Sequence, residues 1–171
     1  YIRNQRLMKL SRTAFIVLLI VFNMAIDQIS KIIVRAQVTP FSETPIIGDY
    51  FTLHNVENTG AFLGMGSDLN PTIKLIFLMI LPVIVLGYLI YYIFKNKDMD
   101  TYGMIALSSI AGGGIANVFD RIVYGSVTDF LHINLGGVFR TGIFNLADLS
   151  VTSGMIILLI GSYINRKNEK L

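Results

Sequence analysis

The stretch YGMIALSSIAGGGIANVFDRI, residues 102–122, decides the fold of this chain. Its side chains are apolar or small almost throughout, and its only charged residues, Asp120 and Arg121, lie at its end. A helix of roughly 20 residues, rising about 1.5 Å per residue, crosses the ~30 Å hydrocarbon core of a bilayer. We therefore predict that this stretch forms a membrane-spanning helix.

Three further apolar stretches of similar length lie at residues 13–34, 73–94 and 143–164. The composition of the whole chain agrees with a membrane protein, because 53% of the 171 residues are hydrophobic, 15% are charged and the mean hydropathy is +0.63. We expect an all-α membrane protein, a bundle of four transmembrane helices in a single domain that covers residues 13–164.

The basic residues predict the orientation of this bundle. Cytoplasmic loops of membrane proteins carry an excess of lysine and arginine. This rule predicts that the tails, residues 1–12 and 165–171, and the loop after the second span are cytoplasmic. It also accounts for the net charge of +3 and the pI near 9.2 without a nucleic-acid partner. Nine of the fourteen basic residues lie in these three places: Arg3, Arg6, Lys9, Arg12, Lys95, Lys97, Arg166, Lys167 and Lys170.

The first outer loop, residues 36–71, is too long for a bare connection between two spans. Pro40, Pro45 and Gly48 interrupt it, and the segment YFTLHNV at residues 50–56 then alternates apolar and polar side chains. Such alternation is typical of a β-strand. We expect a small extracytoplasmic β-sheet platform that rests on the membrane.

The third span carries a run of small residues between Ser108 and Ala116, which lets neighbouring helices approach closely in lipid. Polar residues follow the run at one end of the same helix. A charge left toward lipid costs on the order of 3 kcal/mol, so Asp120 and Arg121 should be paired or face a polar cavity. Two alternatives remain open for them, a structural ion pair and a contact with substrate. Asn117 lies on a shared helix face with these two residues.

Asp27 and Lys31 stand four residues apart in the first span, the spacing at which a carboxylate and an ammonium group pair on a helix. We interpret them as a supporting ion pair.

Asp129 and Asp148 are the strongest candidates for catalysis. Asp129 follows the third span and Asp148 opens the fourth, so both are expected at the outer end of the bundle. Two carboxyl groups held close together share a proton. One can then act as a general base on water while the other donates a hydrogen bond to a scissile carbonyl, as in an aspartic protease. A small membrane carrier that uses the carboxylates as a proton relay, and a non-catalytic assembly subunit, remain alternatives.

Other chemistries find little support in the sequence. The chain has no cysteine, so thiol nucleophiles, disulfides and cysteine metal sites are excluded. His54 and His132 lack the spacing of a metal-binding pair and are expected to be exposed or capping residues. No phosphate-binding glycine loop or serine nucleophile elbow appears. We therefore expect neither a metal nor another cofactor.

Five strings in order resemble the lipoprotein signal peptidases, the signal peptidase II family, over residues 14–164. They are DQISK (27–31), NTGAF (58–62), GGGIANVFDR (112–121), VTDF (127–130) and FNLAD (144–148). The resemblance implies that Asp129 and Asp148 are the catalytic pair. It further implies that a second set lines or supports the site, with no metal: Asn58, Gly60, Asn117, Asp120, Arg121, Asn145, Asp27 and Lys31.

The same resemblance implies an aspartic endopeptidase of the bacterial inner membrane, with both termini in the cytoplasm and the active site toward the extracytoplasmic face. Its substrates would be prolipoproteins, cut just before a diacylglyceryl-modified cysteine. Membrane lipids would be its other partners, and cyclic peptides of the globomycin type would inhibit it.

Overall fold

The computed structural model describes residues 11–61 and 65–168. Residues 1–10 and 169–171, which make up most of the predicted cytoplasmic tails, lie outside the described residues. In chain order the elements are α1 (Arg12–Gln37), β1 (Glu43–Ile47), β2 (Phe51–Asn58), α2 (Pro71–Lys74), η2 (Leu75–Ile80), α3 (Leu81–Lys95), α4 (Thr101–Tyr124), β3 (Val127–Ile133) and α5 (Leu146–Asn168).

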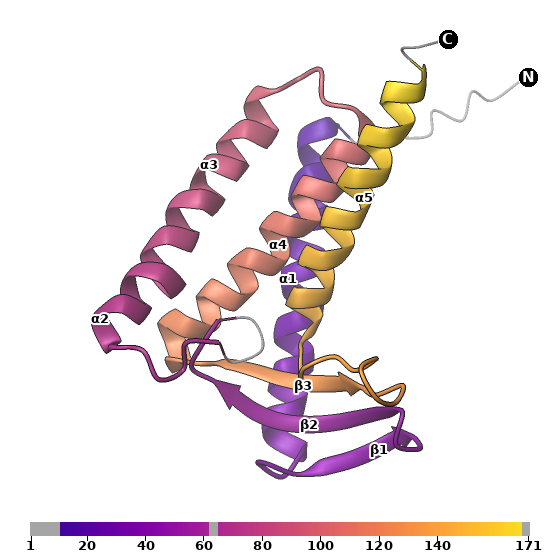
Figure 1. The fold of residues 1–171 in the computed structure, drawn as a ribbon. Coiled ribbons are helices and arrows are strands. Elements are labelled where there is room, and N and C mark those ends of the chain that lie inside the picture. The colour runs from indigo at the N-terminus through magenta and orange to yellow at the C-terminus, as the bar shows by residue number, and fades with distance from the viewer. Residues whose placement is uncertain (1–10, 62–64, 169–171) are drawn as a thin grey trace, which may run out of the picture.

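Four helical segments in the described part of the chain are long and apolar enough to cross a membrane. They run beside one another as a bundle, and a small antiparallel sheet lies across one end of it (Figure 1). This confirms the predicted fold class of a four-helix membrane bundle with a β-sheet. The segments are Arg12–Gln37, Pro71–Lys95, Thr101–Tyr124 and Leu146–Arg166.

The second of these segments changes its helical winding along its length. Its middle part, η2, is a π-helix, and Pro82 is the second residue of α3 directly after it. Proline has no backbone N–H to donate and crowds the preceding turn. The wider π-helical turns immediately before Pro82 accommodate this residue within a continuous span.

Helix α4 lies at the centre of the bundle because three consecutive glycines face three different neighbours. A Cβ atom on Gly112 would come within 2.8 Å of the Ile20 carbonyl of α1, and one on Gly114 within 2.6 Å of the Leu86 side chain of α3. A Cβ atom on Gly113 would collide with the Ala147 carbonyl of α5. Successive residues of a helix point about 100° apart, so each glycine opens one side of α4 to one helix. The predicted packing role of these small residues is confirmed.

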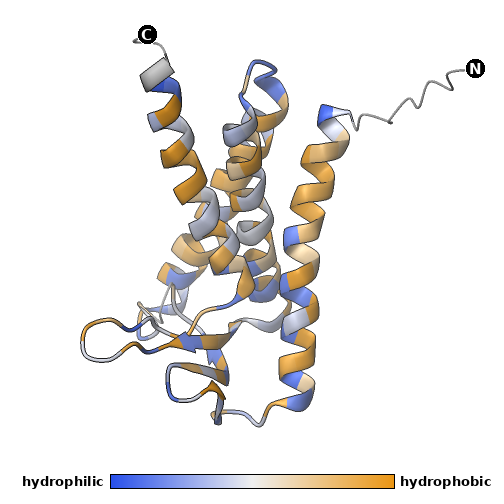
Figure 2. Cartoon of the chain, turned by 90° about the vertical axis from the view of Figure 1, so that its right-hand side faces the viewer, coloured by the Kyte–Doolittle hydropathy of each residue, from blue (hydrophilic) through white to orange (hydrophobic). Residues whose placement is uncertain are grey.

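The sheet has the strand order β1-β2-β3, and both strand pairs are antiparallel. The first two strands come from the expected loop, but β3 follows α4 and was not expected as a strand. The chain termini of the described part lie at the opposite end of the bundle from the sheet (Figure 1). Figure 2 shows mostly apolar helices, with hydrophilic residues in the half near the sheet and in the loop at the other end.

Candidate active site

Asp129 is in the middle of β3, opposite Val56 of β2, and only 4% of its surface is exposed. Its Oδ2 accepts a hydrogen bond of 2.9 Å from Asn58 Nδ2, and its Oδ1 accepts one of 2.6 Å from Asn145 Nδ2. Burial, with a smaller contribution from the charge of Asp148, raises the pKa of Asp129 to about 6, although the two amide donors oppose this shift. This carboxyl group therefore holds a proton more firmly than an exposed aspartate does.

Asp148 is in the first turn of α5, where it belongs to the cap of the helix. Asn145 Oδ1 accepts a hydrogen bond of 2.9 Å from the Asp148 backbone N–H, and Asp148 Oδ2 accepts one of 3.3 Å from the Asn145 N–H. This reciprocal pair is a capping box. The other carboxylate oxygen of Asp148 accepts a bond of 2.9 Å from Asn117 Nδ2 of α4.

Asn145 connects the two aspartates. Its side chain is fully buried, and its Nδ2 donates both to Asp129 and, at 3.2 Å, to Asn117 Oδ1. Because Asn117 donates in turn to Asp148, the two asparagines join the carboxyl groups of β3 and α5 into one hydrogen-bonded cluster. The sequence predicted all four residues as parts of a site, and the fold brings them together.

A buried cluster of charges lies under these residues. Asp27, Lys31 and Asp120 have no exposed surface, and Lys31 Nζ lies 2.7 Å from a carboxylate oxygen of each aspartate. Its third donor bond, of 2.9 Å, goes to Asn117 Oδ1. A buried lysine has three donors to satisfy, and here each has a partner. The predicted pairing of Asp27 with Lys31 is confirmed.

Asp27 also supports the start of α5, because its Oδ1 accepts a hydrogen bond of 2.9 Å from the Ala147 backbone N–H. The first N–H groups of a helix have no partner within the helix, so this carboxylate fills a vacant acceptor position. The charge cluster thereby fixes the helix end that carries Asp148.

Of the two alternatives for Asp120 and Arg121, Asp120 follows the first, because it forms an ion pair, with Lys31 and not with Arg121. Adjacent residues of a helix point in different directions, and Asp120 faces α1. Arg121 instead donates a bond of 2.8 Å from Nη2 to the Gly60 carbonyl and one of 3.3 Å from Nη1 to the Asn117 carbonyl. The Gly60 N–H donates to Asn58 Oδ1 at 2.8 Å, so the segment after β2 is held against the site.

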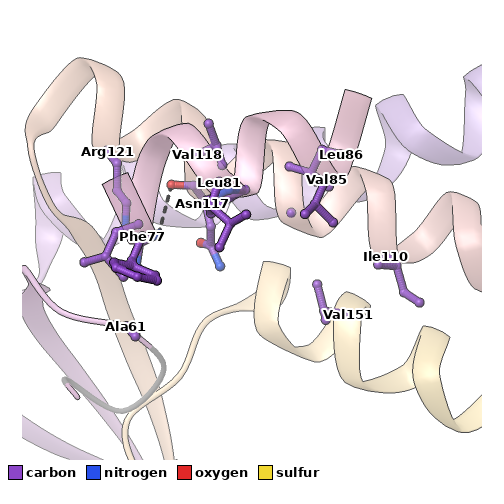
Figure 3. Close-up of a pocket in the computed structure, with 13 residues that line it drawn as sticks. Ala61, Phe77, Leu81, Val85, Leu86, Ile110, Asn117, Val118, Arg121 and Val151 are labelled. Carbon is purple, nitrogen blue, oxygen red and sulfur yellow. Dashed lines mark hydrogen bonds between the residues drawn. The ribbon is translucent and has the colours of Figure 1, made fainter. Parts of the chain in front are cut away.

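A largely apolar groove of about 450 Å³ opens beside this cluster, between α3, α4 and α5. Figure 3 shows Asn117 and Arg121 on its wall, near Phe77 and Ala61. The remaining wall is formed by aliphatic side chains, which include Leu81, Val85, Leu86, Ile110, Val118 and Val151. The groove therefore joins an apolar channel to hydrogen-bonding groups, which suits an elongated apolar ligand with a polar end.

The two histidines are partly buried, whereas the sequence predicted exposed or capping residues. His54 of β2 and His132 of β3 are partly buried on neighbouring strands, with ring centroids 5.8 Å apart in an edge-to-face arrangement. Strand β3, which the sequence analysis missed, is the reason that they meet. Within residues 11–61 and 65–168, no group of three or more histidine, aspartate or glutamate side chains is arranged to hold a metal ion.

Three neighbours of the site were missed from the sequence: Arg35, Glu57 and Thr128, which contact one another between α1 and the sheet. One signal was present. Arg35 follows Asp27 and Lys31 at the same four-residue spacing, so all three lie on one face of α1.

The four helices and the buried polar cluster at their sheet end define the class of this protein, a multi-pass membrane protein with a polar site inside its bundle. A family model described as Signal peptidase (SPase) II matches residues 19–164. The chain belongs to the signal peptidase II family.

Individual relatives agree with this assignment. The lipoprotein signal peptidase of Clostridium novyi (strain NT) is 31% identical over 144 residues, which cover 84% of this chain and 94% of that protein. The lipoprotein signal peptidase of Staphylococcus aureus (strain JH9) is 30% identical over 154 residues, which cover 90% and 91%.

Solved structures resemble the fold as well. A bacterial membrane enzyme determined by the in meso method at 2.3 Å resolution matches with a TM-score of 0.78 and 28% identity, over 90% of each chain. A second, at 1.9 Å resolution, gives a TM-score of 0.74 and 28% identity, over 86% of this chain and 91% of the other. Family membership makes the chain a membrane peptidase, a hydrolase of lipoprotein processing that acts on prolipoprotein signal peptides.

Proposed function

We propose that this protein is an aspartic endopeptidase that cuts prolipoproteins just before a diacylglyceryl-modified cysteine, with Asp129 and Asp148 as its catalytic pair. One observation carries the proposal. Asn145 bonds to both carboxyl groups, and Asn117, which bonds to Asn145 and Asp148, lines the apolar groove. Two carboxyl groups from different elements, linked by one buried amide, suit the activation of a water molecule between them.

In this mechanism Asp129 holds the proton and Asp148 is ionised. The raised pKa of Asp129 supports its role as the protonated member of the pair. Asp148 removes a proton from the water molecule while the water oxygen attacks the scissile carbonyl carbon. Asp129 donates a hydrogen bond to the carbonyl oxygen as negative charge develops there. The C–N bond then breaks, and the amine of the cysteine leaves with a proton from the pair.

The surrounding residues would hold this geometry and the substrate backbone. Arg121 lines the polar end of the groove, where a guanidinium suits peptide carbonyl groups, and the Gly60 carbonyl accepts a hydrogen bond from Arg121 and so helps to hold it there. Asn58, Asn117 and Asn145 orient the carboxyl groups. Asp27, Lys31 and Asp120 support them from beneath.

The groove would take the apolar core of the signal peptide, whose side chains match its aliphatic walls. Cyclic peptides of the globomycin type would inhibit the enzyme by occupying the polar end. Membrane lipids would surround the bundle, whose outer surface is rich in exposed apolar side chains. The diacylglyceryl group of the substrate would lie among these lipids.

The orientation in the bacterial inner membrane follows from charge. Arg12, Lys95, Lys97 and Arg166 lie at or near the bundle end opposite the sheet, and the positive-inside bias supports a cytoplasmic location of that end and of both termini. The sheet and the two aspartates would then face the extracytoplasmic side.

The test is cleavage of a diacylglyceryl-modified prolipoprotein by purified enzyme in detergent. Asparagine keeps the size and polarity of aspartate but does not ionise, so Asp129→Asn and Asp148→Asn should each lower kcat by about a hundredfold or more. Asp49→Asn is the matched control, because Asp49 is exposed in the turn between β1 and β2.

The control should cut at the rate of the parent. Near-parent cleavage by either folded dyad variant would refute the catalytic pair. If the parent bound substrate without cutting it and instead moved protons across a vesicle membrane, the carrier function would replace this proposal.

A further inference from the structure

Arg35 lies near the end of α1 and extends into the junction between the helical bundle and the sheet. Its side chain is 21% exposed, and its guanidinium carbon lies 3.9 Å from the centre of the Tyr124 ring of α4. Its Nε donates a hydrogen bond of 2.7 Å to Thr128 Oγ1 of β3. A single arginine of α1 thus contacts both α4 and β3, the strand next to the bundle.

On the sheet side, Arg35 is bonded to the strand pair that carries the first candidate aspartate. Thr128 Oγ1 donates a hydrogen bond of 2.7 Å to Glu57 Oε1, and Arg35 Nε lies 3.8 Å from the same oxygen. Glu57 and Thr128 are directly opposite each other in the ladder of β2 and β3. The next residue after each is Asn58 and Asp129, which bond to one another.

On the helix side, Arg35 Nη2 lies 3.6 Å from Asp120 Oδ1, beside the buried charge cluster. That cluster continues through Lys31 and Asn117 to the carboxylate of Asp148. Among the residues that the structure describes, only Arg35 forms ion pairs both with a helix of the bundle and with the sheet.

We propose that Arg35 is a positioning residue that seats the β2–β3 strand pair on the bundle and so sets the position of Asp129 relative to Asp148. The inference rests on the proposed function, in which these two carboxyl groups act on the same water molecule. Asp129 belongs to the sheet and Asp148 to the bundle, so their separation depends on how one rests on the other.

This role predicts a large effect on rate and a small one on stability. The ion pair of Arg35 with Glu57 is partly exposed and contributes little to folding, and Asp120 keeps its pair with Lys31 when Arg35 is replaced. A displacement of about 1 Å between reacting groups, in contrast, can lower a rate about a hundredfold. The substrate groove is lined by other residues, so binding should change little.

The first experiment measures kcat and KM for Arg35→Gln, Arg35→Lys and Thr128→Val. Arg35→Gln should lower kcat by about tenfold to a hundredfold and leave KM within about twofold. Arg35→Lys keeps the positive charge but has a single ammonium group in place of the planar guanidinium with its several N–H donors. Its kcat should therefore lie between those of Arg35→Gln and the parent. Thr128→Val keeps shape and all charges, removes the bridging hydroxyl and should lower kcat in the same direction.

Glu43→Gln is the matched control, because Glu43 pairs with His54 on the far side of the sheet and contacts neither aspartate. It should leave both constants unchanged. A folded Arg35→Gln variant with parent kcat, or a change in KM alone, would overturn the positioning role.

A second experiment measures the seating of the sheet without turnover. Because the chain has no cysteine, spin labels can be placed at Thr44→Cys in β1 and Leu159→Cys in α5, both exposed. Arg35→Gln should broaden the label-to-label distance distribution, and Glu43→Gln should not. An unchanged distribution would refute the inference. If the parent fails to cut prolipoprotein, the proposed function fails first, and this measurement still decides whether Arg35 holds the sheet.

Discussion

Asn145 illustrates how single residues combine folding and candidate catalysis in this protein. Its Oδ1 caps α5 by accepting from the Asp148 N–H, and its Nδ2 donates to Asp129. The cap orients the helix that carries one aspartate, and the donor holds the other. The two functions use different atoms of one side chain, so an asparagine serves here where an aspartate could keep only the cap.

The pKa of Asp129 determines the pH dependence that we expect for the reaction. This pKa is raised to about 6, chiefly by burial, and Asp129 holds the proton of the pair in the proposed mechanism. As pH rises through this pKa the proton is lost, so kcat/KM should fall about tenfold per pH unit above it. Initial rates at low substrate concentration, measured at pH values below and above this pKa, test the prediction. The apparent pKa of the fall in kcat/KM belongs to the coupled pair of aspartates and not to one residue.

At saturating substrate, the fall in kcat should occur at a higher pH than the fall in kcat/KM. Bound substrate excludes water from the site and so favours the neutral carboxyl group of Asp129. A kcat/KM that rises through this range would reverse the assignment and make Asp129 the base.

At the residue scale the sequence predicted side-chain types better than partners. The four-residue spacing of Asp27 and Lys31 correctly predicted their pair. The partner of Asp120 could not be predicted, because Lys31 is 89 positions away in the chain and meets it only when α1 packs against α4. Contacts between helices depend on helix rotation, which no local pattern states.

At the scale of elements, α4 is the axis of the bundle, and its glycines determine how near each neighbour lies. A methyl group on Gly113 would meet the backbone carbonyl of Ala147, which cannot rotate away. The same approach brings Asn117 of α4 to Asp148 and Asn145 at the start of α5. Helix packing and the assembly of the site are therefore one geometric requirement.

Gly113→Ala should destabilise the protein although alanine favours helices by about 1 kcal/mol over glycine. The collision with Ala147 should outweigh that gain, since overpacking costs roughly 1–3 kcal/mol. Thermal unfolding in detergent measures the difference. Gly87→Ala on α3 is the control, because a Cβ there meets no atom within 4 Å, and it should unfold at the parent temperature or above. Equal midpoints for the two variants would contradict this account.

Gly114→Leu should narrow the substrate groove. Gly114 lines it opposite Leu86, and a new side chain there meets only the flexible side chain of Leu86, so the signal peptide should lose space at a smaller cost to the fold than a substitution at Gly113. We expect kcat/KM to fall about tenfold or more, mainly through KM. Gly87→Leu adds the same side chain on the outside of α3 and should leave both constants unchanged. A loss confined to kcat would show that the groove does not bind the signal peptide.

Elements differ in how much of them the sequence predicts. Long apolar stretches identify four spans because the bilayer sets their length and composition. Strand β3 was missed because it is seven residues long and its most buried side chains include Thr128 and Asp129, so the usual apolar alternation is absent. The hydrogen bonds of β3 to β2 form although its sequence lacks the apolar alternation of a strand, so the segment that was expected to be a loop is an edge strand of the sheet.

For the whole molecule, the position of the sheet matters as much as the position of the helices. The loop between β3 and α5 exposes Leu135, Val138 and Phe139 by 66%, 87% and 74%, next to Arg140. Exposed apolar side chains beside a basic one suit the boundary between lipid tails and phosphate groups. Because β3 carries both this loop and Asp129, lipid contact at the loop would set the depth of the site.

The absence of tryptophan from the chain gives this idea a direct test, since Phe139→Trp creates a single tryptophan, whose emission can be excited separately from that of the tyrosines. In vesicles with brominated lipid tails, its emission should be quenched and shifted to the blue, because an aromatic ring at this position lies among the upper acyl segments. Thr44→Trp, on the outermost strand β1, is the matched control and should be quenched much less, since two strands separate it from the bundle. Equal quenching would mean that the whole sheet is immersed, and none at Phe139→Trp would mean that the loop stands in water. Either result would leave the depth of Asp129 to the helices alone.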